Sequence, residues 1–144
     1  SRPHPEHKVY PYLLKDLAIE QPNQVWAADI TYVPMARGFM YLVAVMDWHS
    51  RKVLSFKLSN TLDANFCIDA LNEALDHYGP HRISNTDQGA QFTSKEFIQT
   101  LESNDIRVSM DGRRRVQDNI FIERLWWTVK HRYLYLNAFD NGLQ

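Results

Sequence analysis

Three carboxylates occupy positions in the sequence where an acidic residue calls for a structural or chemical explanation. Asp29 lies inside an apolar and aromatic run, Asp87 precedes a glycine-containing loop, and Glu123 lies in a segment with helical apolar spacing. A carboxylate buried among apolar side chains costs about several kcal/mol unless a cation compensates it. Each acid alone fits a capping, turn or salt-bridging role. Together they predict one shared site, in which cations relieve the repulsion among the three.

The chemistry of such a site follows from its ligands. Carboxylate oxygens with no His or Cys nearby favour Mg²⁺ or Mn²⁺ over zinc. Two such ions, roughly 3.5–4 Å apart, form a clamp for in-line displacement at phosphorus. One carboxylate must bridge both ions while the other two each hold one. Asp29, Asp87 and Glu123 are therefore the predicted metal ligands and catalytic residues.

The elements that must position these acids follow from apolar periodicity. Runs of β-branched and aromatic residues predict three strands joined by short loops, which form an antiparallel meander. Beyond residue 60 the apolar period changes to that of helices, separated by two more short strands. The expected strands span 25–33, 39–47, 52–59, 82–86 and 107–110, and the expected helices about 62–78, 95–103 and 118–133. This order predicts an α/β fold with a mixed five-stranded sheet, three strands antiparallel and the later ones parallel, with helices on both faces.

Helix caps are predicted from side chains that accept backbone N–H groups. Asn60 or Thr61 is expected to cap the first helix, which ends at Gly79. Thr93 and Glu96 have the spacing of a capping box for the second helix. The expected caps therefore place both helix starts just after a strand or a loop.

Length and composition bound the remaining possibilities. A chain of 144 residues with 44% hydrophobic content supports one domain with a true core. Residues 1–24 are expected to form an arm or linker and 25–144 the core, without that domain's last helix. No apolar run reaches the roughly 18–20 residues that span a bilayer, so no membrane association is expected. The single Cys67 excludes an internal disulfide framework and fits a reducing, intracellular setting.

Charge is unevenly distributed along the chain. Residues 107–132 hold seven Lys or Arg against three acids, a net charge of +4. The whole chain has a formal charge of −1, so the remainder carries −5. A basic segment on an acidic domain indicates one surface that faces phosphate groups. A solvated charged helix and loop explains the same pattern equally well.

The sequence also resembles a known family. Asp87 and Glu123 have 35 residues between them, as in the Asp, Asp-35-Glu signature of retroviral integrases and insertion-sequence transposases. The segments around the three acids, 26–32, 85–94 and 118–126, are similar to the same group. The resemblance implies a ribonuclease H-like fold, cleavage of DNA at an element's ends and strand transfer into target DNA. It further implies two Mg²⁺ or Mn²⁺ ions with DNA bound, a homo-oligomer on DNA, no small-molecule cofactor, and a bacterial cytoplasmic location beside the nucleoid.

Several residues are expected to contact DNA. Lys130 lies two helical turns after Glu123, where the family carries a basic residue that touches DNA. The other expected DNA contacts are Asn119, Gln88, Arg113, Arg114, Arg115 and Arg124. Asn119 fits a helix cap as well, and Gln88 fits a solvated loop. Arg114 and Trp127 depart from the family pattern, which usually has a glycine and a basic residue there.

Two other functions remain open on the sequence alone. A ribonuclease H or resolvase-like nuclease would use the same fold without strand transfer. A catalytically inactive remnant would bind DNA through its basic C-terminal segment. Asp47 is expected to serve a turn rather than a metal, and Trp126 is expected in the core with Trp127 exposed.

Overall fold

The protein is described here by a computed structural model. It describes residues 9–112 together with 123, 126, 127, 130 and 131. The chain divides into two compact units, residues 1–113 and residues 114–144, and each is described by itself. Among the described residues, no helix has the length and apolar character to cross a membrane.

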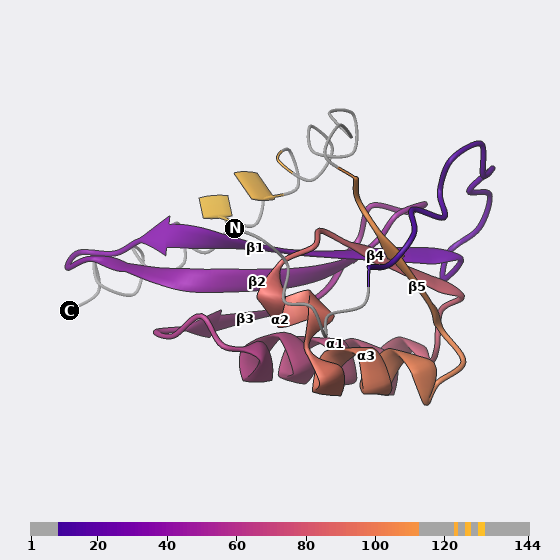
Figure 1. Cartoon of the computed structure of the whole chain (residues 1–144). Coiled ribbons are helices and arrows are strands. Elements are labelled where there is room, and N and C mark those ends of the chain that lie inside the picture. Colours follow the sequence, from indigo (N-terminus) through magenta and orange to yellow (C-terminus); the bar gives the residue numbers. More distant parts are fainter. Residues whose placement is uncertain (1–8, 113–122, 124–125, 128–129, 132–144) are drawn as a thin grey trace. The chain divides into compact units, whose positions relative to one another are not determined.

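The first unit is built on a five-stranded sheet in the order β3-β2-β1-β4-β5 (Figure 1). Its strands are β1 Val25–Pro34, β2 Phe39–Asp47, β3 Val53–Ser59, β4 Ile83–Thr86 and β5 Arg107–Met110. β1, β2 and β3 pair antiparallel, whereas β1–β4 and β4–β5 pair parallel. The predicted mixed sheet is therefore confirmed, with every strand within one or two residues of its expected bounds.

Strand β1 is the centre of the sheet. All but its first residue pair with β2, from Trp26↔Asp47 to Pro34↔Phe39, whereas only Val25, Trp26 and Ala27 pair with β4. Alternate residues of a strand point to opposite faces, so Trp26 and Ala28 share one face while Ala27 and Asp29 share the other. The last seven residues of β1 thus have no pairing partner in β4.

Three helices belong to this unit: α1 Ala64–Tyr78, α2 Ala90–Thr93 and α3 Lys95–Glu102. Figure 1 shows α1 and α3 lying along one face of the sheet. The main core forms between this face and the helices. Its buried members include Trp26, Ala28, Val43, Val45, Phe66, Cys67, Ala70, Leu71, Phe92, Phe97, Ile98 and Leu101. These are the alternating strand positions and the periodic helix positions that the sequence pattern predicts.

The helix caps differ from expectation. Asp63, rather than Asn60 or Thr61, is the N-cap of α1, and its side chain accepts the N–H of Asn65. Thr61 Oγ1 instead donates to Asp63 Oδ2 at 2.8 Å. Ser94 caps α3, accepting the N–H of Phe97, so the capping residue is one later than predicted. Ordinary capping residues occur in succession here, and tertiary packing decides which one the helix uses.

The described residues of the second unit are helical. Glu123 is exposed, Lys130 is half-buried, and Trp126 is buried at 6% exposure. Trp127 is exposed and stacks on His131 with ring centroids 4.5 Å apart. The different expectations for Trp126 and Trp127 are confirmed. The predicted bounds of this helix lie outside the described residues.

Candidate active site

The parallel pairing of β1 with β4 places two of the predicted acids at matching positions. The last paired couple is Ala27↔Asn85, and Asp29 and Asp87 each follow it by two residues. Neighbouring strands in a sheet lie about 4.8 Å apart. Beyond Thr86 the chain leaves the sheet, so Asp87 stands at the carboxyl end of β4, beside the part of β1 that carries Asp29. Ligands of open α/β sheets bind at such strand ends.

Asp87 is held by the turn that follows it. Its Oδ1 accepts the backbone N–H of Gly89 at 2.8 Å, and Thr86 Oγ1 donates to its carbonyl oxygen at 2.9 Å. The side chain is exposed, and no described residue donates a hydrogen bond to Oδ2. A side-chain carbon at Gly89 would lie 2.8 Å from Asp87 Oδ1, closer than such atoms approach. The glycine is therefore required for space, since it lets the backbone orient the carboxylate.

Asp29 is half-buried on the sheet face opposite Trp26 and Ala28. Its Oδ1 accepts the N–H of the next residue, Ile30, at 2.9 Å. The two carboxylates thus each use one oxygen to accept a backbone N–H beside them. These two hydrogen bonds help to fix the direction of both groups.

A buried polar chain supports the end of β4. Asn85 has no exposed surface; it accepts from Ser109 Oγ at 2.8 Å and donates to Asp111 Oδ1 at 2.9 Å. Ser109 Oγ also accepts the N–H of Leu13, at 2.9 Å. These residues join β4, β5 and the segment before β1. The sequence pattern did not predict that Asn85 links these segments, although an asparagine in a short buried strand must find hydrogen-bond partners.

A cavity of about 240 Å³ opens beside Asp87. It is lined by the distal part of β1, by β2, and by the turn and helix after β4. The lining residues are Ile30, Thr31, Tyr32, Tyr41, Leu62, Asp87, Gly89, Gln91 and Phe92. Gln91 Nε2 donates to the Leu62 carbonyl at 3.3 Å, which ties α2 to the loop before α1. The candidate site therefore adjoins a largely apolar and aromatic hollow.

The third predicted acid belongs to the other unit. Glu123 is an exposed helical residue of residues 114–144. Among the described side chains, no group of three or more His, Cys, Asp or Glu is gathered closely enough to hold a metal. The register thus brings Asp29 and Asp87 to neighbouring strand positions, and the convergence of Glu123 with them stays a prediction.

The predicted DNA contacts are placed only in part. Gln88 is exposed, and its Nε2 donates to the Tyr10 carbonyl in a long bond of 3.4 Å. Lys130 is helical in the second unit. The remaining predicted contacts lie outside the described residues: Arg113, Arg114, Arg115, Asn119 and Arg124.

The opposite end of β1 holds another carboxylate in a different setting. Asp47 is 2% exposed; its Oδ1 accepts the N–H of Asn23 at 2.7 Å, and its Oδ2 accepts both the N–H and the hydroxyl of Ser50, at 2.8 and 2.7 Å. Asn23 also accepts from Trp26 Nε1 at 2.9 Å. The expected turn role of Asp47 is confirmed, because both of its oxygens are engaged in holding loops.

His81 completes this closed end of the sheet. Its ring stacks on Trp26 with centroids 3.8 Å apart, and it is 3% exposed. Neither ring nitrogen has a hydrogen-bond partner among the described residues. Burial lowers the pKa of His81 to about 3, against a smaller opposing effect of Asp47. His81 is therefore a neutral core ring at physiological pH, which sequence spacing did not reveal.

The oxygen donors of Asp29 and Asp87 fit a hard divalent cation. Both are carboxylates, and in each residue a backbone N–H orients the carboxylate through Oδ1. The nearby sulfur does not compete for the role. Burial, aided by Asp63 and Asp87, raises the pKa of the Cys67 thiol to about 12, so Cys67 stays protonated and apolar. Mg²⁺ and Mn²⁺ prefer such all-oxygen sites, completed by water and phosphate.

Comparisons with known proteins find similar sequences. Residues 19–115 match the family model described as the integrase core domain. The chain is 32% identical over 115 residues to the transposase for insertion sequence element IS904 of Lactococcus lactis, covering 78% of this chain and 46% of that protein. It is 34% identical over 120 residues to the transposase InsF for insertion sequence IS3A of Escherichia coli K12, covering 82% and 42%. The chain thus spans less than half the length of these relatives.

Solved structures share the fold. The HTLV-2 integrase catalytic core domain in complex with magnesium matches with a TM-score of 0.68 and 26% identity, over 83% of this chain and 76% of that one. A chain of the simian T-cell lymphotropic virus intasome in complex with the PP2A regulatory subunit B56 gamma matches with a TM-score of 0.72 and 25% identity, over 96% of this chain and 49% of that one. The ribonuclease H-like fold expected from the sequence is confirmed.

Proposed function

This chain belongs to the integrase core domain family, and from that premise we propose that it is the catalytic core of an insertion-sequence transposase that cleaves DNA at the element's ends and joins them to target DNA. The observation that carries the proposal is the β1–β4 register, which sets Asp29 and Asp87 two residues past the last paired couple. Its curated relatives are transposases of insertion sequences. The activity requires DNA of both the element and the target as partners.

Three carboxylates are proposed to hold the metal: Asp29, Asp87 and Glu123. Two Mg²⁺ or Mn²⁺ ions would supply activation of the attacking oxygen and stabilisation of the leaving oxygen. The protein's own part is to fix the ligands. The N–H of Ile30 orients Asp29, and the N–H of Gly89 orients Asp87, so that neither carboxylate must reorganise when DNA arrives. The magnesium in the HTLV-2 integrase core supports this choice of metal.

Two further features of the proposal come from the family. Joining two DNA ends requires two active sites, so the chain is proposed to act as a homo-oligomer on DNA, in the bacterial cytoplasm beside the nucleoid. The intasome neighbour supports the assembly on DNA. The predicted DNA contacts, Lys130 foremost, would lie along the basic segment and make binding strongly dependent on salt.

The test uses the full-length protein and oligonucleotides that carry the ends of its own element. With Mg²⁺ or Mn²⁺, the wild type is expected to nick these ends and to join the resulting 3′-hydroxyl to plasmid DNA. Asp29→Asn, Asp87→Asn and Glu123→Gln are each expected to abolish both products. Asp69→Asn, which changes an exposed acid on α1, is the matched control and keeps both.

Other outcomes separate the competing functions. Nicking without any joined product would support a ribonuclease H or resolvase-like nuclease instead. Failure of the wild-type protein to bind Mn²⁺ at millimolar concentration or to cut DNA would identify an inactive remnant. Retention of cleavage by Asp87→Asn would refute the assignment of this residue as a metal ligand.

A further inference from the structure

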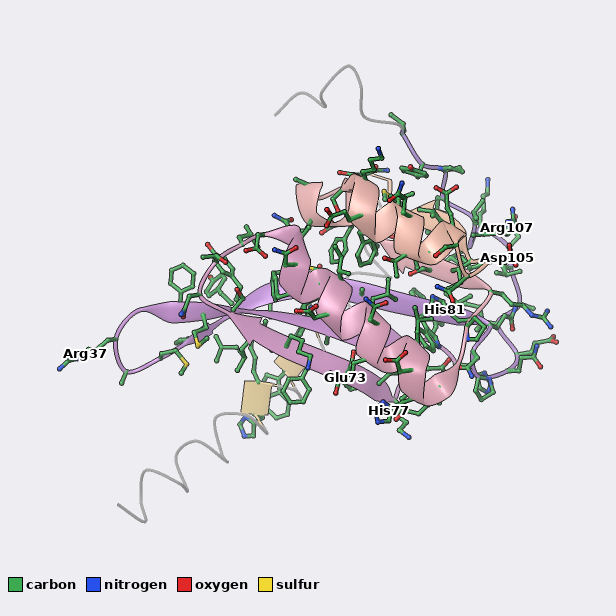
Figure 2. All side chains as sticks on the ribbon, turned by 90° about the horizontal axis from the view of Figure 1, so that it is seen from below. Arg37, Glu73, His77, His81, Asp105 and Arg107 are labelled. Atoms are coloured by element: carbon green, nitrogen blue, oxygen red, sulfur yellow. The ribbon has the colours of Figure 1, made fainter. Side chains whose placement is uncertain are left out.

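The hairpin of β1 and β2 carries a row of aromatic rings at its far end. Tyr32 pairs with Tyr41 across the strands, and Phe39 lies edge-on to both, with ring centroids 5.7 Å from Tyr32 and 5.3 Å from Tyr41. Tyr32 is 61% exposed and Phe39 is 53% exposed. Figure 2 shows this hairpin reaching its tip at Arg37, away from the end of the molecule that holds His81. A contiguous exposed apolar group of this kind marks an interaction site.

The aromatic row leads directly into the cavity beside Asp87. Tyr32 and Tyr41 line one side of this hollow, while Gly89, Gln91 and Phe92 line the side next to Asp87. At about 240 Å³ it is smaller than the roughly 300–1,000 Å³ of pockets for drug-sized ligands. The hollow therefore suits one small planar group rather than a whole nucleotide pair or a peptide.

The chemistry of the lining excludes a phosphate and favours a neutral ring. Among the described residues, no Lys or Arg lines the cavity, and the one charged lining group is the carboxylate of Asp87. The side-chain nitrogen of Gln91 donates to the carbonyl of Leu62, and its side-chain oxygen lies beside Gly89. This oxygen can accept a hydrogen bond from a group in the cavity. A nucleobase presents an aromatic face for stacking and N–H groups for such an acceptor.

We propose that this cavity, together with Tyr32 and Tyr41, receives an unpaired nucleobase of the DNA strand whose phosphate lies at Asp87. The inference rests on the proposed function and adds a base-binding pocket to it. A base is joined to its phosphate through a single sugar, so a phosphate at Asp87 delivers its base within reach of the hollow. Stacking on the tyrosine rings offsets the cost of taking that base out of the duplex.

The position of the pocket favours DNA over a second copy of the chain. A surface for self-association has no need to adjoin a metal-binding carboxylate, whereas a base pocket must. The cavity also shares Gly89 with the turn that orients Asp87. Occupation by a base would thereby link strand unpairing to placement of the phosphate.

The experiment compares two DNA duplexes bound by the full-length protein in Ca²⁺. One is blunt, and the other ends in a three-nucleotide unpaired tail that carries 2-aminopurine, whose fluorescence falls when it stacks. The wild type is expected to quench the probe and to prefer the tailed duplex. Tyr32→Ala should lose the quenching and about tenfold in affinity for the tailed duplex, since one base–aromatic stack has this magnitude.

Three controls make the result decisive. Tyr32→Phe retains the ring and should behave as the wild type, and Phe56→Ala removes an exposed ring of β3 that does not line the cavity. Asp87→Asn is scored separately by Mn²⁺-dependent nicking, so a failed DNA-cutting function is distinguished from a failed base pocket. Unchanged quenching and tail preference in Tyr32→Ala would overturn the base pocket. The proposal would also be overturned if Tyr32→Ala lost self-association of the protein while its binding of the tailed duplex stayed normal.

Discussion

Two carboxylates of the strands or loops beside β1 are chemically identical and structurally opposite. Asp47, opposite Trp26, is buried and accepts three hydrogen bonds from Asn23 and Ser50. Asp87, level with Asp29 where β4 ends and leaves β1 open, is exposed and accepts one described bond to its side chain, from Gly89. In Figure 2, His81 lies towards the end of the sheet that holds Asp47, which we call the closed end, and Arg37 lies at the far tip of the β1–β2 hairpin, beyond the open end where β4 no longer covers β1. Asp47, with both oxygens in hydrogen bonds, holds the fold together, whereas Asp87, with one described hydrogen bond, remains available to a ligand.

The sharpest test of this contrast is Asp87→Asn. Loss of the charge proposed to bind metal should lower DNA cleavage on the order of 10³-fold or more, because charge stabilisation at phosphorus depends on the ions. The free energy of unfolding should stay unchanged or rise, since the exposed carboxylate supports little structure. Cleavage rates and urea unfolding of the same preparation measure both. A large loss of stability in Asp87→Asn with normal cleavage would show that Asp87 has a structural role rather than a catalytic one.

Asp47→Ala should show the opposite pattern. It leaves the N–H groups of Asn23 and Ser50 and the Ser50 hydroxyl without their acceptor, which should cost about 3 kcal/mol of unfolding free energy. Urea unfolding monitored by circular dichroism measures the loss. Asp47→Asn keeps one acceptor oxygen and should lose less. Equal stability of Asp47→Ala and wild type would contradict the structural role.

His81 predicts how the closed end responds to acid. Its pKa is lowered from 6.5 in the unfolded chain to about 3 in the folded one. Protons therefore bind the unfolded state more readily, so stability is complete above pH 6.5 and falls as the pH drops toward 3. At about 1.4 kcal/mol per pH unit, the loss at pH 5 is roughly 2 kcal/mol. Unfolding measured from pH 8 to 5 should show this slope, and His81→Phe should remove this contribution; an unchanged slope would refute it.

Gly89→Ala should produce the smallest effect, confined to the open end. The added carbon would lie 2.8 Å from Asp87 Oδ1, so the carboxylate must turn away. Since φ at Gly89 is −61°, the backbone itself accepts alanine. Cleavage and Mn²⁺ affinity should fall about tenfold, in the range seen when a group that orients a ligand is lost. Gly112→Ala, which meets no atom within 4 Å, is the matched control. Normal cleavage by Gly89→Ala would show that the turn does not orient Asp87.

The sheet was predictable because its signals are local. β2, Phe39–Asp47, is a continuous apolar run, and β3, Val53–Ser59, alternates polar with apolar residues, so each strand is apparent from its own residues. The four-residue helix α2, Ala90–Thr93, was missed because it is too short to establish an apolar period. Its start depends on the turn at Gly89, and a single turn of helix leaves little trace in sequence.

The sequence singled out two acids that the register sets at neighbouring strand positions, but it did not reveal what surrounds them. Asp29 stood out because an acid among apolar residues requires an explanation, and Asp87 because it precedes a glycine-containing loop. The Asn85–Ser109–Asp111 chain was not foreseen, since its members lie 24 to 26 residues apart and meet only through the β4–β5 pairing. His81 was missed for the same reason, because its stacking partner Trp26 is distant in sequence. Side-chain chemistry is local, whereas neighbours are set by topology.

The unequal pairing of β1 has a consequence for handling the protein. Among the described strands, β4 covers β1 only as far as Ala27, so the remaining length of β1 has an open side toward the candidate site. An uncovered strand side is a template on which another extended chain can add. The opening proposed to admit a nucleic acid strand is thus also the region where concentrated, DNA-free protein would begin to aggregate.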